Sequence, residues 1–69
     1  MQFKLGQHSV RFFINPDNDG WKVLQQIGLE DAWDDPVQIG ENYNDRRKAK
    51  NAINRQLKEL RADPYYAGG

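Results

Sequence analysis

The 69-residue sequence has no cysteine, so neither a disulfide nor a thiolate metal site can stabilise its fold. Its longest apolar run covers residues 12–14, far short of the roughly 20 residues that a membrane-spanning helix needs. The N-terminus shows no signal-peptide pattern. We therefore expect a soluble, cytoplasmic protein that does not bind a membrane and that forms one small domain over residues 1–69.

Side chains for nucleophilic or acid–base chemistry are scarce. His8 is the only histidine, and Ser9 is the only serine in a chain without threonine. Neighbours on an extended chain point to opposite sides, so His8 is badly placed to activate Ser9, and we expect it to be exposed in a turn. Walker, GxGxxG and HExxH motifs are also missing. The sequence therefore predicts a protein that is not an enzyme and that uses no cofactor and no metal ion.

Two acidic segments have spacings that are also found in metal or acid–base sites. Asp31, Asp34 and Asp35 would share one face of a helical turn. Residues 15–20 begin like an EF-hand loop, but Gln26 stands where that loop has its bidentate glutamate. We interpret the first segment as an acidic surface and the second as a turn.

Alternating and β-branched residues predict three strands, at residues 2–5, 10–14 and 21–27. Turn-forming residues separate them, at residues 6–9 and 15–20. Gly28 is expected to break the third strand, with one helical turn at residues 29–33 and a short edge strand at residues 37–39.

The clearest element is a helix from about Arg46 to Arg61, with Asp45 as its N-cap. Its apolar face repeats at helical spacing, at Ala49, Ala52, Ile53, Leu57 and Leu60. Asp63-Pro64 ends the helix, and residues 66–69 are expected to form a frayed tail. The terminal Gly68-Gly69 is similar to the tail of ubiquitin-like modifiers, but those proteins reach it from a strand, so we do not assign that family.

An apolar sheet face must be covered, and the amphipathic helix is the available cover. The sequence thus predicts an α+β fold, in which a three- or four-stranded antiparallel meander is packed on one face by a C-terminal helix. The predicted core is Phe3, Leu5, Val10, Phe12, Ile14, Trp21, Val23, Ile27, Ile39, Ala49, Ile53, Leu57 and Leu60.

The formal net charge of zero hides two oppositely charged parts of the chain. Residues 1–45 carry three basic and eight acidic side chains, whereas residues 46–69 carry seven basic and two acidic ones. The two parts therefore have net charges of −5 and +5. Such an asymmetry steers charged partners toward separate surfaces.

One helix face, opposite the apolar one, carries Arg47, Lys50, Asn51, Asn54, Lys58 and Arg61. It is either a phosphate-binding surface, whose asparagines reach base edges, or a solvated face. A second candidate site is the acidic cluster around an aromatic ring, namely Glu30, Asp31, Trp33, Asp34 and Asp35. It is typical of an interface anchor with a charged rim, the alternative being that Trp33 only caps the core.

The outward face of the sheet is expected to carry Lys4, Arg11, Phe13, Lys22, Leu24 and Gln26. Phe13 and Leu24 are apolar at positions where polar residues are usual. They either lie under the tail, beneath Tyr65 and Tyr66, or form an exposed binding patch. We expect the tail to cover them.

The order of three strands and a helix resembles the DNA-binding domains at the arm of tyrosine recombinases and in plant AP2 factors. The resemblance implies that the sheet enters the major groove, with Lys4, Arg11, Lys22 and Gln26 in the contacting positions. The strongest basic stripe, however, lies on the helix, on the far side of the molecule.

We expect a small binding protein that docks on a partner protein through its opposed acidic and basic surfaces. Phage or mobile-element inhibitors of a host machine have this size and charge balance. The alternative is a nucleic-acid-binding domain that uses the basic helix or the sheet. The oligomeric state is left open by the sequence.

Overall fold

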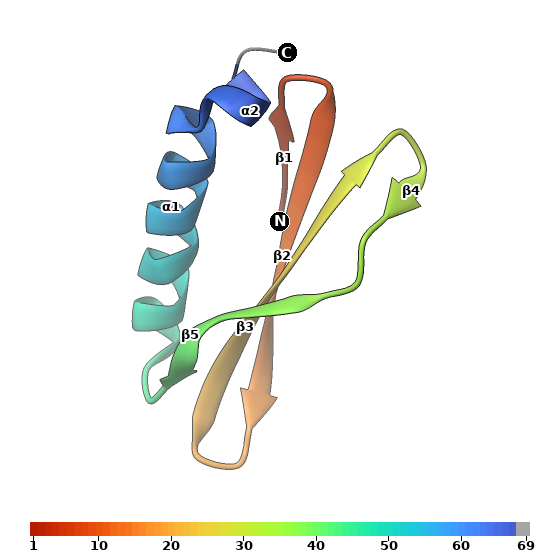
Figure 1. The fold of residues 1–69 in the computed structure, drawn as a ribbon. Coiled ribbons are helices and arrows are strands. Elements are labelled where there is room, and N and C mark those ends of the chain that lie inside the picture. The colour runs from red at the N-terminus through yellow and green to blue at the C-terminus, as the bar shows by residue number, and fades with distance from the viewer. Residues whose placement is uncertain (68–69) are drawn as a thin grey trace.

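The first 29 residues form two consecutive hairpins in the computed structural model, which describes residues 1–67 (Figure 1). The hairpins are built from β1 (Gln2–Leu5), β2 (His8–Asp17) and β3 (Gly20–Leu29). Two-residue loops, Gly6-Gln7 and Asn18-Asp19, join the strands, so both turns are shorter than the sequence predicts. Residues 8–9, 15–17 and 20, which the sequence assigns to the turns, gain cross-strand partners instead and lengthen the strands.

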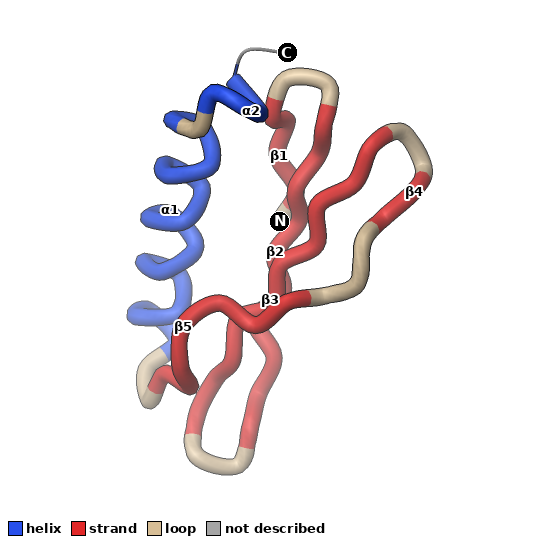
Figure 2. The backbone as a smooth tube through the Cα atoms, viewed as in Figure 1, coloured by secondary structure: helices blue, strands red, loops and turns tan. Residues whose placement is uncertain are grey.

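Two further strands pair with β3 on its other side, which makes a five-stranded sheet (Figure 2). They are β4 (Ala32–Trp33), paired with the end of β3, and β5 (Val37–Tyr43), paired with its first half. The helical turn expected at residues 29–33 is wrong, because Glu30 and Asp31 form the loop of a tight hairpin. Gly28 does not break β3 either, since it stays in register opposite Trp33.

The C-terminal helix α1 (Arg46–Ala62) packs on one face of the sheet, as the sequence predicts. The Asp45 side chain caps it, because its Oδ1 accepts a hydrogen bond from the Arg47 backbone N–H at 2.8 Å. A short helix, α2 (Pro64–Ala67), follows directly. Within residues 1–67 no helix has both the length and the apolar character that crossing a bilayer demands.

Tyr66 and Ala67 belong to α2, whereas the sequence places a frayed tail from residue 66 onward. The Asp63 side chain accepts a hydrogen bond from the Tyr65 backbone N–H at 2.9 Å, which stabilises the start of this turn. Gly68 and Gly69, the diglycine end of the sequence, lie outside the described residues.

The α+β class, with an antiparallel sheet and a covering C-terminal helix, is confirmed. Phe12 and Ile53 are the largest fully buried side chains, one from each layer. Every residue of the predicted core is either buried or packed against the buried cluster. Ala52, Tyr43 and Tyr66 add to it. One hydrogen bond also crosses the layers, from Gln56 Nε2 to Gln25 Oε1 at 3.1 Å.

Candidate functional site

The register of β2 and β3 shows which side chains share the sheet face turned away from α1. Arg11 pairs with Gln26, and Phe13 pairs with Leu24. Directly opposite residues of an antiparallel pair point to the same side, whereas the buried Phe12 points to the helix. The six residues predicted for the outward face therefore lie there, namely Lys4, Arg11, Phe13, Lys22, Leu24 and Gln26.

Tyr65 and Tyr66 do not cover this face, so that expectation is wrong. The ring centroids of Tyr65 and Tyr66 lie 5.7 and 5.3 Å from that of His8. His8 is opposite Leu5 and points to the helix side of the sheet. Because α2 follows α1 directly and finds an aromatic partner in His8, it stays on that side. His8 is consequently half-buried in an aromatic cluster, not simply exposed in a turn.

An arginine stacked between two aromatic rings occupies the uncovered face. The Arg11 guanidinium carbon lies 3.9 Å from the centroid of the Trp33 ring and 5.5 Å from that of Phe13. Arg11 Nε donates a hydrogen bond to Gln26 Oε1 at 2.8 Å, and Gln26 Nε2 donates one to the Asp34 carbonyl oxygen at 3.1 Å. We call this surface the outer patch, which comprises Arg11, Phe13, Leu24, Gln26 and Trp33.

The outer patch combines apolar area with a guanidinium whose position is restrained. The two rings and the Gln26 side chain limit the rotamers of Arg11, so less entropy is lost when a partner orders it. Phe13 is 39% exposed, and Leu24 and Trp33 are half-buried. Trp and Arg are the residue types that contribute most binding energy in protein interfaces. The arrangement suits binding, and it holds no nucleophile–base pair.

The sequence pointed to Trp33 and Arg11 separately but did not join them. The stack depends on β4 pairing with the end of β3, because this pairing lets the Trp33 ring reach across β3 to Arg11 on β2. Gly28, in an otherwise regular strand, was the available signal, because a glycine in a strand often marks a close approach.

The carboxylates of the acidic cluster lie on the two segments that flank β4. Glu30 and Asp31 form the β3–β4 loop, and Asp34 and Asp35 follow β4. Burial raises the pKa of Tyr66, and the negative charges of Tyr65, Asp63 and Asp34 raise it further. Trp33, by contrast, belongs to the outer patch.

The predicted helical face of Asp31, Asp34 and Asp35 does not exist, because the segment is a hairpin. Across residues 1–67, no three His, Asp or Glu side chains are grouped closely enough to hold a metal ion.

The basic side chains of the helix form a continuous exposed surface. We call it the basic stripe, which comprises Arg47, Lys50, Asn51, Asn54, Lys58 and Arg61, all exposed. Apart from the N-cap carboxylate of Asp45, no acidic residue in the first turn of α1 offsets the positive end of the helix dipole. The stripe therefore remains strongly positive along the whole helix.

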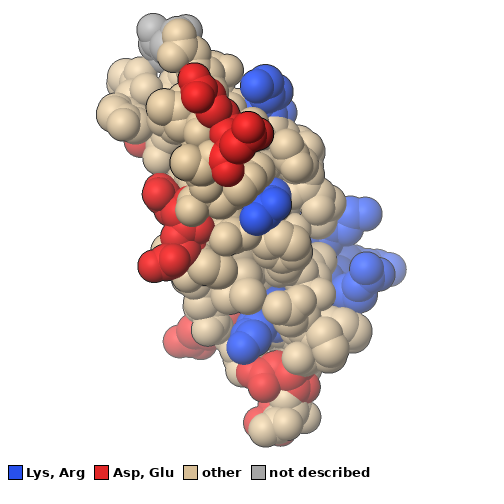
Figure 3. Space-filling model, turned by 90° about the vertical axis from the view of Figure 1, so that its right-hand side faces the viewer, with Lys and Arg blue, Asp and Glu red and all other residues tan. Residues whose placement is uncertain are grey.

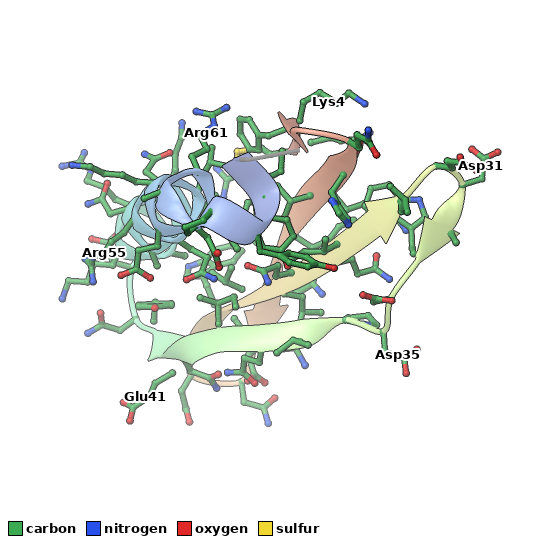
Figure 4. All side chains as sticks on the ribbon, turned by 45° about the horizontal axis from the view of Figure 1, so that its top comes forward. Lys4, Asp31, Asp35, Glu41, Arg55 and Arg61 are labelled. Atoms are coloured by element: carbon green, nitrogen blue, oxygen red, sulfur yellow. The ribbon has the colours of Figure 1, made fainter. Side chains whose placement is uncertain are left out.

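The carboxylates that flank β4 and the basic side chains of α1 project from different sides of the molecule. Figure 4 shows Arg55 and Arg61 projecting from the helix side, and Asp31 and Asp35 projecting from the β4 side. Figure 3 views the molecule from the side away from the helix, where acidic side chains lie along the top, left and bottom of the view and basic side chains lie along its right edge, with a mostly uncharged surface between them. The charge asymmetry along the chain thus becomes a charge separation in space.

Comparisons with protein-family models, with curated proteins and with solved structures find no match. The resemblance to DNA-binding domains that read the major groove with a sheet stays a prediction from the order of the elements. The five-stranded sheet departs from the three strands of that pattern.

Proposed function

We propose that this chain is a non-enzymatic binding protein that docks on a partner protein through the outer patch. The observation that carries the proposal is the Trp33–Arg11 stack, which lies beside Phe13 on a sheet face that no other element within residues 1–67 covers. A folded chain gains little stability from exposing an aromatic ring and a leucine side by side. A partner that covers them removes this apolar area from water.

The surroundings of the patch favour a protein over a nucleic acid as its partner. Lys4 and Lys22 lie on the same face, but the carboxylates of Asp31 and Asp35 project from the adjoining β4 side. A phosphate backbone approaching the sheet would meet these negative charges. A protein surface with mixed charges, by contrast, complements an apolar centre with a charged rim. A host machine blocked by a phage or mobile-element protein is one kind of partner that such a surface fits.

The proposal is tested by affinity capture from a lysate of the source cells, with quantitative mass spectrometry. Phe13→Gln and Trp33→Ala each remove one ring of the outer patch, and circular dichroism verifies that both variants fold. Tyr65→Ala is the matched control, because Tyr65 is a 72% exposed aromatic residue outside the patch. We expect a protein that the wild type and the control retain and that both patch variants lose. The same set of proteins on all four columns would overturn the proposal.

The second candidate function, nucleic-acid binding, rests on the basic stripe. Beside its N-terminal end, Arg46, Arg47 and Lys50 flank a shallow hollow of about 380 Å³, with Met1 and Ile14 as its apolar wall. Cations in the first turn oppose the helix dipole, so they do not serve helix stability. Phosphates along a backbone are the natural ligands of such a row.

Fluorescence anisotropy with generic duplex DNA over a salt series separates the two candidates. Six phosphate contacts predict a log–log salt slope of about −5. Binding with that slope, reduced by Lys50→Ala and Lys58→Ala and not by Trp33→Ala, would establish the second function. Absence of binding at low salt would exclude it and leave the protein partner as the sole candidate.

A further inference from the structure

The charge separation makes one side of this protein complementary to the other side of a second copy. The acidic side consists of the β3–β4 loop and the segment after β4, with Glu30, Asp31, Asp34 and Asp35. The basic stripe lies on the opposite side, beyond the helix layer. The formal net charge of the whole chain is zero, so two copies have no net charge repulsion to overcome.

The dimensions of the molecule leave room for the helix of a second copy along its long edge. The Cα atoms extend 38 × 22 × 15 Å, which is the shape of a thin slab made of one sheet and one helix. The 17 residues of α1 span about 25 Å, which is shorter than the long edge of that slab. A helix from a second copy therefore fits along the exposed side of the sheet.

The outer patch supplies a contact that charge attraction alone would not give. Phe13 is 39% exposed and Leu24 is half-buried, so a second copy can remove their apolar area from water. The aliphatic stems of the lysines and arginines in the basic stripe can cover these side chains.

We propose that the partner of the outer patch and the acidic side is the basic stripe of a second copy of this chain. The inference rests on the proposed function, because it uses the same docking face. Since the two surfaces differ and lie on opposite sides, the contact is head-to-tail and does not close into a symmetric pair. Each added copy presents a free acidic side and a free basic stripe, so assembly continues beyond a dimer.

Sedimentation equilibrium over a concentration series tests the proposal. In about 0.01 M salt the Debye length is about 30 Å, and in about 1 M salt it is about 3 Å. At low salt we expect the weight-average mass to rise with concentration from 8.0 kDa to more than twice that value. At high salt the protein is expected to return to the monomer. A wild type that stays at 8.0 kDa under both conditions would overturn the inference.

Two charge-reversal variants then separate head-to-tail contact from other association. Asp31→Lys with Asp35→Lys destroys the acidic side, and Lys50→Glu with Lys58→Glu destroys the basic stripe. Each variant alone is expected to be monomeric. An equimolar mixture is expected to assemble again, because each variant keeps the surface that the other lacks and the two reversed surfaces also attract each other. A mixture that stays monomeric, or a variant that still assembles alone, would contradict the head-to-tail contact.

The matched control is Lys48→Glu with Arg55→Glu, which makes the same charge change on exposed helix positions outside the basic stripe. The control is expected to assemble with at most a few-fold loss of affinity, and a loss equal to that of the stripe variant would overturn the assignment.

Self-association and docking by the outer patch are overturned by different results. A monomeric wild type overturns only self-association, whereas capture that ignores Phe13 and Trp33 overturns docking by the outer patch.

Discussion

The indole ring of Trp33 lies against Gly28, its partner across the β3–β4 pair. A Cβ at position 28 would come within 2.8 Å of ring carbon Cε3 and of the Ala32 carbonyl oxygen. The glycine therefore allows the Trp33 ring to lie close to β3. The ring can then stack with Arg11 on β2, the strand on the other side of β3. The outer patch depends on this contact.

Gly28→Ala is consequently expected to displace Trp33 and to lower the free energy of unfolding by about 1–3 kcal/mol, the usual cost of overpacking. Urea denaturation gives the value. The same substitution is made in a Trp33→Ala background, where only the carbonyl contact remains and the cost should be smaller. An equal cost in the two backgrounds would show that the ring does not lie against this glycine.

Phe12 and Phe13 are neighbours in sequence but lie on opposite faces, with exposures of 1% and 39%. Phe12→Ala is expected to cost about 3–5 kcal/mol, which is most of the stability of a domain of this size. Phe13→Ala should cost about 1–2 kcal/mol, because its ring is only partly covered. Thermal unfolding of both variants tests this order, and equal losses would contradict the assignment of the two faces.

Glu30 adopts a positive φ of 57° in the β3–β4 loop. This left-handed conformation costs an L-residue about 1–2 kcal/mol, whereas glycine adopts it freely. Glu30→Gly is expected to stabilise the fold by up to about 1 kcal/mol. This figure is the strain relieved in the folded chain minus the cost of the greater conformational entropy that glycine has in the unfolded chain. The neighbouring Asp31→Gly change, at a residue without a positive φ, should instead lower Tm. Equal decreases for both variants would contradict the loop geometry.

Burial raises the pKa of Tyr66 above its ordinary value of 10.0, and nearby negative charges add to the shift. The folded chain thus holds this proton more tightly than the unfolded chain. Stability is expected to fall as pH rises from about 10 through the raised folded-state pKa. Below pH 10 both states keep the proton, so the residue adds no pH dependence there.

Denaturation at several alkaline pH values measures this decline. Tyr66→Phe has no phenolic proton and should show a shallower decline than the wild type. In a titration followed by tyrosine absorbance, the same variant should lose the ionisation that occurs at the highest pH. An unchanged decline would mean that α2 does not hold Tyr66 against the core.

Much of the fold follows from local pattern, as Phe12 and Asp45 illustrate. Alternation around Phe12 assigns side chains to the two sheet faces, and the helical spacing after Asp45 assigns α1 and its buried stripe. These patterns are local and strong, so both layers and the core could be predicted.

The remaining features depend on contacts between segments far apart in the chain. Glu30 is not a typical residue for a tight hairpin, and its conformation follows from the pairing of Gly28 with Trp33. Tyr66 packs on His8 from the other end of the chain, which keeps α2 on the helix side of the sheet. Neither contact leaves a periodic signal in the sequence.

Site-specific photo-crosslinking in the source cells tests docking by the outer patch most directly. Benzoylphenylalanine replaces Phe13 in the patch, or Tyr65 on α2 as the control, and crosslinked products are identified by mass spectrometry. We expect a specific protein product from position 13 and none from position 65, with peptides of the same chain in that product if the partner is a second copy. No product from position 13, or the same products from both positions, would contradict the outer patch as the docking surface.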